Sequence, residues 1–292
     1  MMNSFTKSPL WDFIFESESF KSIDINTFKN DGANSKITQY SHKTHGIFFF
    51  KNLVYQMAKQ FDESELDLLN NVPNRDTGGG LTISYKQILL DLDYLLALEE
   101  AIFLQDKLKT INSVLEIGAG YGRTCHTILS LFPNITRYDI IDLPKMLGLS
   151  TLYLKTVATE ANFSKINFIP VGEIGEEKYD LVINIDSMQE MDQKTVESYL
   201  QYINNYGEAF YTKNTVGKFE PSLCGWEESE GSKIAHQSGI LRDVVNIFCP
   251  VELENHRIKF IQKFSPGENW VVKKQADTMP WSHLYQTLFQ KK

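Results

Sequence analysis

A glycine-rich segment in the middle of the chain is the strongest candidate for a ligand-binding site. Residues 114–122, which read VLEIGAGYG, form an apolar run that contains one acid, Glu116, and continues into glycines at alternate positions. Glycine lets the backbone turn sharply and approach a ligand, and a following helix would present unpaired N–H groups to it. Such a loop suits the amino-acid end of S-adenosylmethionine, with Glu116 fixing the turn or reaching the methionine ammonium. Cofactor binding is therefore predicted for Glu116, Gly118, Ala119, Gly120, Tyr121 and Gly122.

Two other interpretations of this loop are less consistent with its residues. A dinucleotide-binding loop carries a third glycine after two further residues, where helix and strand pack closely. This chain has Arg123 at that place, and a long arginine side chain does not fit there. A purely structural glycine turn would not require the strand, the acid and the helix pattern that surround this one.

A second acid follows the next apolar run. The segment "YDIIDLP" places Asp142 at the expected carboxyl edge of the sheet, where a carboxylate can accept hydrogen bonds from both ribose hydroxyls. The same residue could instead cap the helix expected to begin near Pro144. With the glycine loop upstream, ribose binding is favoured. The remaining cofactor contacts are predicted, by position after successive strands, at Leu143, Gly172, Glu173 and Asn184.

The substrate side is expected after the fourth strand, where residues 184–191 are unusually polar. Methyl transfer from a sulfonium needs alignment and, for a hydroxyl acceptor, a base. Glu190 is the first candidate for this catalytic base and His236 the second, although Glu190 could cap a helix and His236 could be a packing residue. Asp186 could orient the acceptor. Substrate contacts are predicted at Arg123, Asp186, Ser187, Met188 and Asn214, with His42, His45 and His126 as further candidates.

The elements that must position these residues follow from hydrophobic periodicity. Residues 1–108 are predicted to form a mainly helical cap, with a hinge at 78–80 and a long buried helix over 85–104. Residues 109–292 alternate short apolar runs with amphipathic segments, which predicts a doubly wound, mostly parallel, seven-stranded sheet with an antiparallel last strand. The five parallel strands are expected at "SVLEIG", "TRYDIID", "INFIPV", "YDLVINI" and "EAFYTKN", and helices at "YGRTCHTILSLF", "LPKMLGLSTLYLKTVA" and "DQKTVESYLQYINNY".

The last part of the chain has a different pattern of apolar residues. "RIKFIQKF" and "NWVVKKQ" flank the turn "SPGE" and are predicted to form an antiparallel hairpin at the sheet edge. The polar stretch from Thr215 to Gly239 is interpreted as a mobile lid over the ligand edge.

Composition limits the function classes. Hydrophobic residues make up 42% of the 292-residue chain and charged residues 23%, so the chain should fold. The net charge of −8 disfavours nucleic acid as a partner. Three widely spaced cysteines give no zinc or disulfide pattern, no metal site is predicted, and no apolar run suits a leader or a membrane span. We expect a cytoplasmic protein with a small-molecule substrate, without membrane partners, in which the N-terminal part could pair two subunits.

The motifs "VLEIGAGYGR", "DIIDLP", "LVINIDSMQEM" and "FYTKN", with "SPLW" near the start, resemble those of the bacterial sugar O-methyltransferase family. The resemblance implies a Rossmann-like class I methyltransferase fold and a sugar hydroxyl as acceptor. It also implies that Glu116, Gly118, Gly120, Gly122 and Asp142 hold the cofactor, and that Ser187, Glu190 and Asn214 lie on the substrate side. The "DLP" element is similar to that of plant small-molecule O-methyltransferases, but their histidine after the fourth strand is not matched here, where Met188 and Glu190 stand.

The sequence bears on three further functions. Nucleobase methyltransferases that act on exocyclic nitrogens carry Asn or Asp, two prolines and an aromatic residue after the fourth strand, and residues 184–187 lack this pattern. A nucleotide-sugar oxidoreductase or epimerase is disfavoured by Arg123. A non-catalytic module that binds S-adenosylmethionine as a sensor or scaffold is compatible with the same motifs.

Overall fold

The structure is a computed structural model that describes residues 16, 24, 29 and 45–292. The chain divides into two compact units, Met1–Gln56 and Met57–Lys292. Helix α3 (Gly46–Ala58) extends across this division, and within it Phe48 and Phe49 contact each other edge to face. The units therefore divide near residue 56, within α3, and the boundary at 108/109 stays a prediction. The motif "SPLW" and His42 lie outside the described residues.

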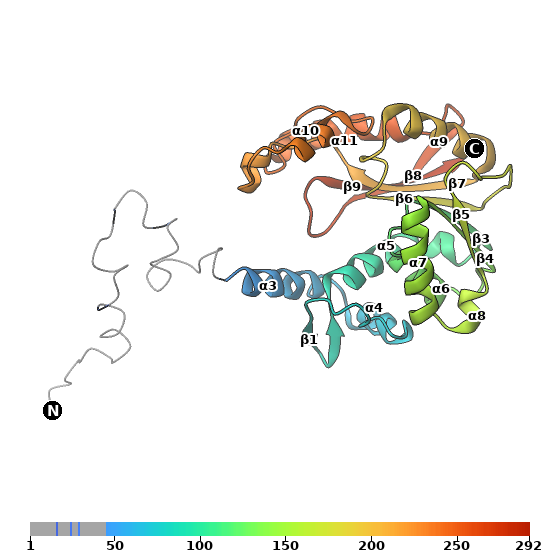
Figure 1. Cartoon of the computed structure of the whole chain (residues 1–292), viewed down its shortest axis with the longest axis horizontal. Coiled ribbons are helices and arrows are strands. Elements are labelled where there is room, and N and C mark those ends of the chain that lie inside the picture. Colours follow the sequence, from blue (N-terminus) through green and yellow to red (C-terminus); the bar gives the residue numbers. More distant parts are fainter. Residues whose placement is uncertain (1–15, 17–23, 25–28, 30–44) are drawn as a thin grey trace. The chain divides into compact units, whose positions relative to one another are not determined.

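The second unit is built on a seven-stranded sheet with the order β5-β4-β3-β6-β7-β9-β8 (Figure 1). The first five of these strands are parallel, whereas β9 is antiparallel to both β7 and β8. This order and the antiparallel β9 match the Rossmann-like methyltransferase fold, which confirms the predicted fold class. The strands are β3 (Ser113–Ile117), β4 (Arg137–Asp142), β5 (Ile166–Pro170), β6 (Leu181–Ile185), β7 (Ala209–Thr215), β8 (Trp270–Asp277) and β9 (Leu284–Lys291).

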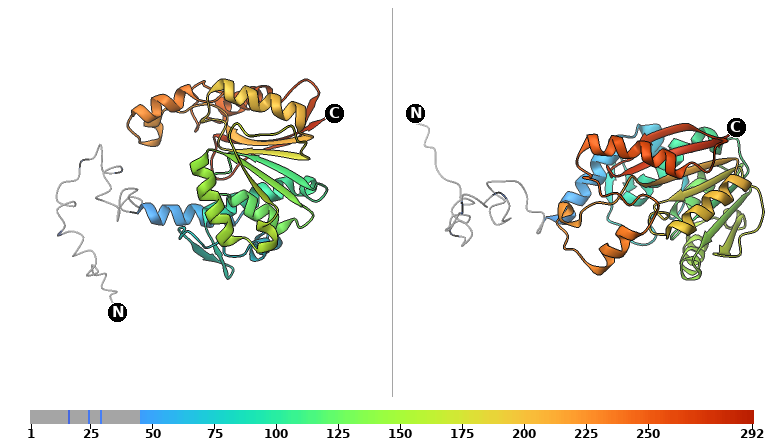
Figure 2. Two further views of the ribbon diagram at one scale, coloured as in Figure 1. Left: turned by 45° about the vertical axis from the view of Figure 1, so that its right-hand side comes forward. Right: turned by 90° about the horizontal axis from the view of Figure 1, so that it is seen from above.

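Helices cover both faces of this sheet. On one face α5 (Leu92–Leu108), α6 (Arg123–Leu131) and α7 (Pro144–Val157) contribute side chains to one apolar core cluster. On the other face α9 (Gln193–Tyr206) and α11 (Pro250–Phe264) contribute to a second cluster. Figure 2 shows the green α7 on one side of the sheet and the yellow to orange α9 and α11 on the other.

The strands bury both faces, so their sequences are nearly continuous apolar runs and not alternating ones. Along β3, Val114 belongs to one core cluster and Leu115 to the other, because successive side chains point to opposite faces. Polar side chains cap the helices that lead away from the sheet. Asp91 accepts a hydrogen bond from the Tyr94 backbone at the start of α5, and Asp192 does the same from Thr195 at the start of α9.

The three predicted helices and five predicted parallel strands in this unit are present, but three other predictions need correction. The segment "RIKFIQKF" is not a strand: it lies in α11, where Leu253, Phe260 and Phe264 are buried at helical spacing. The partner of β8 is the unpredicted β9. The helix expected over 85–104 begins only at Leu92, because residues 83–90 form a small antiparallel hairpin.

The remaining short elements surround this framework. They are α4 (Glu63–Asp67), η1 (Leu68–Asn71), β1 (Ile83–Tyr85), β2 (Ile88–Leu90), α8 (Glu160–Phe163), η2 (Pro221–Cys224) and α10 (Glu230–Gln237). No helix in the described part of the chain combines the length and apolar character needed to cross a membrane.

Candidate active site

The glycine loop joins β3 to α6 and contains three glycines in the left-handed region of backbone conformation. Gly118, Gly120 and Gly122 have φ angles of +74°, +58° and +99°, a region that disfavours residues with a Cβ. A Cβ at Gly118 would lie 2.6 Å from Ser187 Cβ, and one at Gly122 would lie 2.7 Å from a Leu154 methyl group. At Gly120 a Cβ would meet nothing within 4 Å. Gly118 and Gly122 therefore allow close packing, whereas Gly120 leaves its surface open.

The open side of this loop faces a crevice of about 470 Å³ at the carboxyl ends of β3, β4 and β6. This is where ligands bind in open α/β sheets, and the volume is within the range of small-molecule sites. Among the predicted site residues, the structure brings together along its wall Glu116, Gly118, Ala119, Gly120, Tyr121, Arg123, Asp142, Leu143, Asp186, Ser187 and Glu190.

Glu116 is a buried acid at the base of the crevice. Its carboxylate accepts a hydrogen bond of 2.7 Å from the Tyr138 hydroxyl. Burial raises the pKa of Glu116 to about 7, while the hydrogen bond from Tyr138 acts in the opposite direction. A cation beside this carboxyl group would favour its charged form, so the position suits an ammonium group.

Asp142 lies at the end of β4, adjacent to the loop. Its Oδ2 accepts a hydrogen bond of 3.1 Å from Gly120 N, and its Oδ1 accepts one of 2.7 Å from Leu143 N. Leu143 is the N-cap of α7, and this helix has no side-chain cap, so Asp142 does not have the capping role considered as an alternative. Each carboxylate oxygen keeps a lone pair for another donor. Burial raises the pKa of Asp142.

The buried amides at the end of β6 connect the loop to the substrate side. Asn184 Nδ2 donates to Ile117 O at 2.8 Å and contacts Ser187 Oγ at 2.6 Å. Asn184 Oδ1 accepts from Asn214 Nδ2 at 2.8 Å. Asn184 and Asn214 have no exposed surface and do not line the crevice. They therefore lie behind the residues that form the crevice wall, and not at the predicted cofactor and substrate contacts. Met188 is also fully buried, in the core under the sheet, which contradicts its predicted substrate contact.

Two acids follow these amides. Asp186 has a φ of +54°, a strained conformation for a non-glycine residue, and its backbone N donates to Lys213 O at 2.8 Å. Withdrawal from bulk water, reinforced by the charge of Glu190, raises the pKa of Asp186 to about 6. Gln189 Nε2 donates to Asp186 Oδ1. Glu190 ends the turn that begins at Ser187, since Glu190 N donates to Ser187 O at 3.0 Å.

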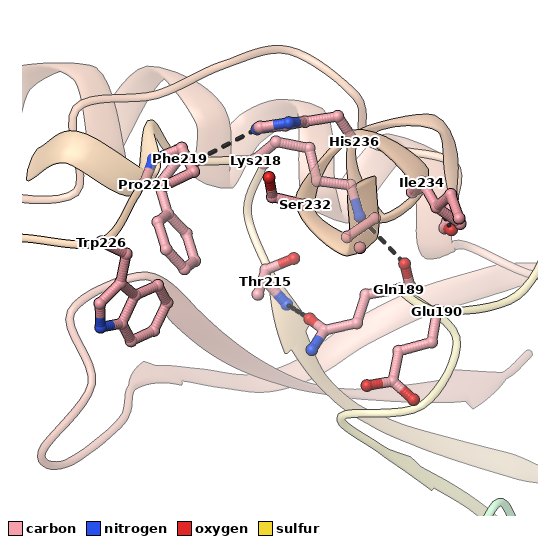
Figure 3. Close-up of a pocket in the computed structure, with 14 residues that line it drawn as sticks. Gln189, Glu190, Thr215, Lys218, Phe219, Pro221, Trp226, Ser232, Ile234 and His236 are labelled. Atoms are coloured by element: carbon pink, nitrogen blue, oxygen red, sulfur yellow. Dashed lines mark hydrogen bonds between the residues drawn. The ribbon is translucent and has the colours of Figure 1, made fainter. Parts of the chain in front are cut away.

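Glu190 also lines a second cavity of about 520 Å³, which the crevice therefore adjoins (Figure 3). This cavity lies under the predicted lid segment, which contains η2 and α10. His236, on α10, lines this cavity and not the crevice, and its Nε2 lies 3.2 Å from Phe219 O. The two predicted catalytic residues are therefore not equivalent, because Glu190 faces both cavities.

A buried ion cluster that was not predicted from the sequence lies beneath the crevice. Lys213 Nζ lies 2.8 Å from a Glu99 carboxylate oxygen and 3.0 Å from Glu100, and Arg123 pairs with Glu100 at 3.0 Å. Lys213 and Glu100 have at most 1% of their surface exposed. The cluster explains why an arginine can follow the glycine loop. The guanidinium of Arg123 reaches α5, where it also donates a hydrogen bond of 2.8 Å to Asp93 O. The available signal was a lysine and two acids inside otherwise apolar runs.

Other predicted residues lie elsewhere. Gly172 and Glu173 are exposed after β5 and do not line the crevice. His126 is buried on α6 with Nδ1 2.8 Å from the Tyr94 hydroxyl, and burial lowers its pKa to about 4, so it is not a substrate contact. His45 lies just before α3. Within the described ranges, no three His, Cys, Asp or Glu side chains gather in a way that could hold a metal ion.

No protein-family model and no curated protein matches the sequence. Among solved structures, the methyltransferase domain of bacterial CtHen1-C is 12% identical, with a TM-score of 0.45 over 67% of this chain and 96% of that chain. Mitomycin 7-O-methyltransferase MmcR is 11% identical, with a TM-score of 0.44 over 79% of this chain and 67% of that chain. Glycopeptide N-methyltransferase MtfA complexed with sinefungin is 12% identical, with a TM-score of 0.45 over 67% and 92%. At these low similarities, the strand order and the site geometry must carry any conclusion.

Proposed function

We propose that this protein is an S-adenosylmethionine-dependent methyltransferase whose acceptor is a hydroxyl of a sugar or of a similar small polar metabolite. The observation that carries the proposal is the crevice in which the open face of Gly120, the carboxylate of Asp142 and the buried Glu116 converge. Beside this crevice, Glu190 faces a second cavity large enough for an acceptor.

The residues of the crevice fit the three parts of S-adenosylmethionine. Glu116 suits the methionine ammonium, because burial raises its pKa and a cation would restore its charge. The unused lone pairs of Asp142 suit the ribose hydroxyls. When bound, S-adenosylmethionine supplies an electrophilic methyl carbon on a sulfonium.

An acceptor hydroxyl bound in the second cavity would be the nucleophile. Its oxygen would take the methyl carbon as the carbon–sulfur bond breaks, with the electron pair of that bond left on sulfur, and its proton would pass to the Glu190 carboxylate. Asp186, fixed by Gln189 on one oxygen, orients the acceptor through the other. Because the reaction is a direct displacement, most of the rate enhancement comes from alignment.

The first test is thermal unfolding with S-adenosylhomocysteine. We expect a rise in melting temperature that grows with ligand concentration, and no comparable rise with a nicotinamide dinucleotide. The Asp142→Ala variant should lose most of this rise. Stabilisation by the dinucleotide alone would refute the proposal in favour of an oxidoreductase or epimerase.

The second test separates a catalyst from a protein that only binds the cofactor. Incorporation of labelled methyl groups into small molecules of a cell extract should fall by about 10²–10⁴-fold in Glu190→Gln, the range typical of a lost general base. The same variant should keep its stabilisation by S-adenosylhomocysteine. Glu197→Gln, on the exposed face of α9, is the matched control and should behave as wild type. Equal labelling by Glu190→Gln would exclude Glu190 as the base.

A further inference from the structure

The second cavity contains a lysine, Lys218, that forms no salt bridge with the described residues. Lys218 Nζ donates to Gln189 O at 3.0 Å, and no carboxylate of the described residues lies within 4.0 Å of it. An ammonium has three donors, so two remain available on the cavity side. Lys218 is half-buried, and loss of solvent together with the nearby Arg242 lowers its pKa, while the charge of Glu190 acts in the opposite direction. A cation held in this way is stabilised when an anion enters.

Aromatic and aliphatic side chains form the other walls of the cavity. Figure 3 shows Phe219 and Trp226 on one side and Ile234 on the other. The ring centroids of Phe219 and Trp226 lie 6.0 Å apart with tilted planes. Trp226 and Ile234 are 62% and 61% exposed, which is unusual for large apolar side chains that face each other across a cavity. These walls suit a ring, because a flat apolar face can cover the indole.

Glu190 and Lys218 both face this cavity. Glu190 lies where the cavity adjoins the crevice, and Lys218 Nζ binds the backbone O of the neighbouring residue, Gln189. A molecule in the cavity can therefore contact the proposed base and the cation together. The protein as a whole carries a net charge of −8 and repels anions, so anion binding here would depend on Lys218 itself.

We propose that this cavity is the acceptor site and that the acceptor is an anionic ring compound, with a carboxylate or phosphate on Lys218 and the ring against Phe219 and Trp226. This inference rests on the proposed function, because it places the methylated hydroxyl at Glu190. It narrows the acceptor from a sugar-like hydroxyl compound to a charged one, such as a sugar acid or a sugar phosphate.

Calorimetric titration of the full-length protein, saturated with S-adenosylhomocysteine, tests this with three probes. These are glucuronate, glucose 1-phosphate and neutral glucose, which share a ring and differ in charge. We expect at least one anionic probe to bind about tenfold or more tightly than glucose, the effect of a hydrogen bond to a charged group. The comparison of the two anions distinguishes carboxylate from phosphate.

Variants locate the charge that is responsible. Lys218→Met should lose the preference for the anion, and Lys218→Arg should keep most of it. Lys233→Met, an exposed position of α10 outside the cavity wall, is the matched control and should bind as wild type. Trp226→Ala should weaken all three probes together. Binding of glucose equal to that of both anions, absence of binding by all three, or anion binding unchanged in Lys218→Met would overturn the proposal.

The charge of the methylated product formed in a cell extract is an independent test of the anionic acceptor. Labelled methyl product from a cell extract should be retained by an anion exchanger at pH 8, and product that flows through would contradict an anionic acceptor. Failure of this inference is distinguishable from failure of the proposed function. Stabilisation by S-adenosylhomocysteine with a neutral labelled product would leave the methyltransferase in place and remove only the anion site.

Discussion

Replacement of Lys213 by methionine should destabilise the fold strongly, because the lysine is the only cation that pairs with Glu99 in the described part of the chain. After the change, Glu100 keeps Arg123 at 3.0 Å and Thr124 at 3.1 Å, but Glu99 keeps only the backbone N of Met279 at 2.8 Å. Removing one partner of a buried ion pair costs about 3–5 kcal/mol. Since Glu99 is 9% exposed and can take up a proton, we expect a value near the lower limit.

Urea unfolding followed by circular dichroism at pH 8 measures this loss in the free energy of unfolding. A loss of about 3 kcal/mol would lower the melting temperature by about 6–12 °C for a unit of this size. Lys273→Met on the exposed edge strand β8 is the matched control and should change the free energy of unfolding by less than about 0.5 kcal/mol. The double variant Glu99→Gln with Lys213→Met should recover part of the loss, since it removes the unpaired charge.

The pH dependence has a definite sign. Burial raises the pKa of Glu99 in the folded protein, and loss of Lys213 raises it further. An acid with a higher pKa in the folded than in the unfolded state binds more protons when folded, so stability increases as pH falls through that window. The deficit of Lys213→Met relative to wild type should therefore be smaller at pH 5 than at pH 8. A variant within about 1 kcal/mol of wild type at pH 8 would show that the cluster contributes little, as some buried ion pairs do.

Three further predictions concern the crevice. Gly118→Ala should lower the melting temperature and abolish stabilisation by S-adenosylhomocysteine, because its Cβ would lie 2.6 Å from Ser187 Cβ at a φ of +74°; unchanged stabilisation would contradict the packing described. The affinity for S-adenosylhomocysteine, measured calorimetrically, should fall as pH is lowered through about 7, where Glu116 takes up a proton, and Glu116→Gln should flatten this profile. The rate of methyl transfer should fall below a pH of about 6 as Asp186 is protonated. A rate that does not change between pH 5 and 8 would exclude a role for the charged form of Asp186.

Much of the parallel part of the sheet could be predicted from sequence. The runs at β3, β4, β6 and β7 are continuous and apolar, and each is followed by a helix or a polar turn, so local pattern and tertiary role agree. The prediction failed at α11, where apolar residues within "RIKFIQKF" alternate over a short window. The helical period becomes visible only over a longer stretch of sequence that includes Leu253, which stands seven residues before Phe260.

The site was predicted less completely because sequence position does not give the direction of a side chain. Asn184 is the last but one residue of β6, and Asp186 and Met188 follow it at alternate positions. Asn184 and Met188 are buried, whereas Asp186, which has a positive φ, lines the crevice. The pairing of Lys213 with Glu99 joins residues 114 positions apart, and no local pattern reports such a contact.

The buried amides explain how the turn that carries Glu190, the proposed base, can be held in register with the glycine loop. Asn184 bonds to the end of β3 through Ile117 O and contacts Ser187, and Ser187 O accepts from Glu190 N. Gly118, in the glycine loop, also packs closely against Ser187. Because the loop and the turn share buried contacts, a displacement of one displaces the other. The distance between the bound methyl group and Glu190 would then depend on rigid backbone contacts and not on a flexible side chain, which is the condition that catalysis by alignment requires.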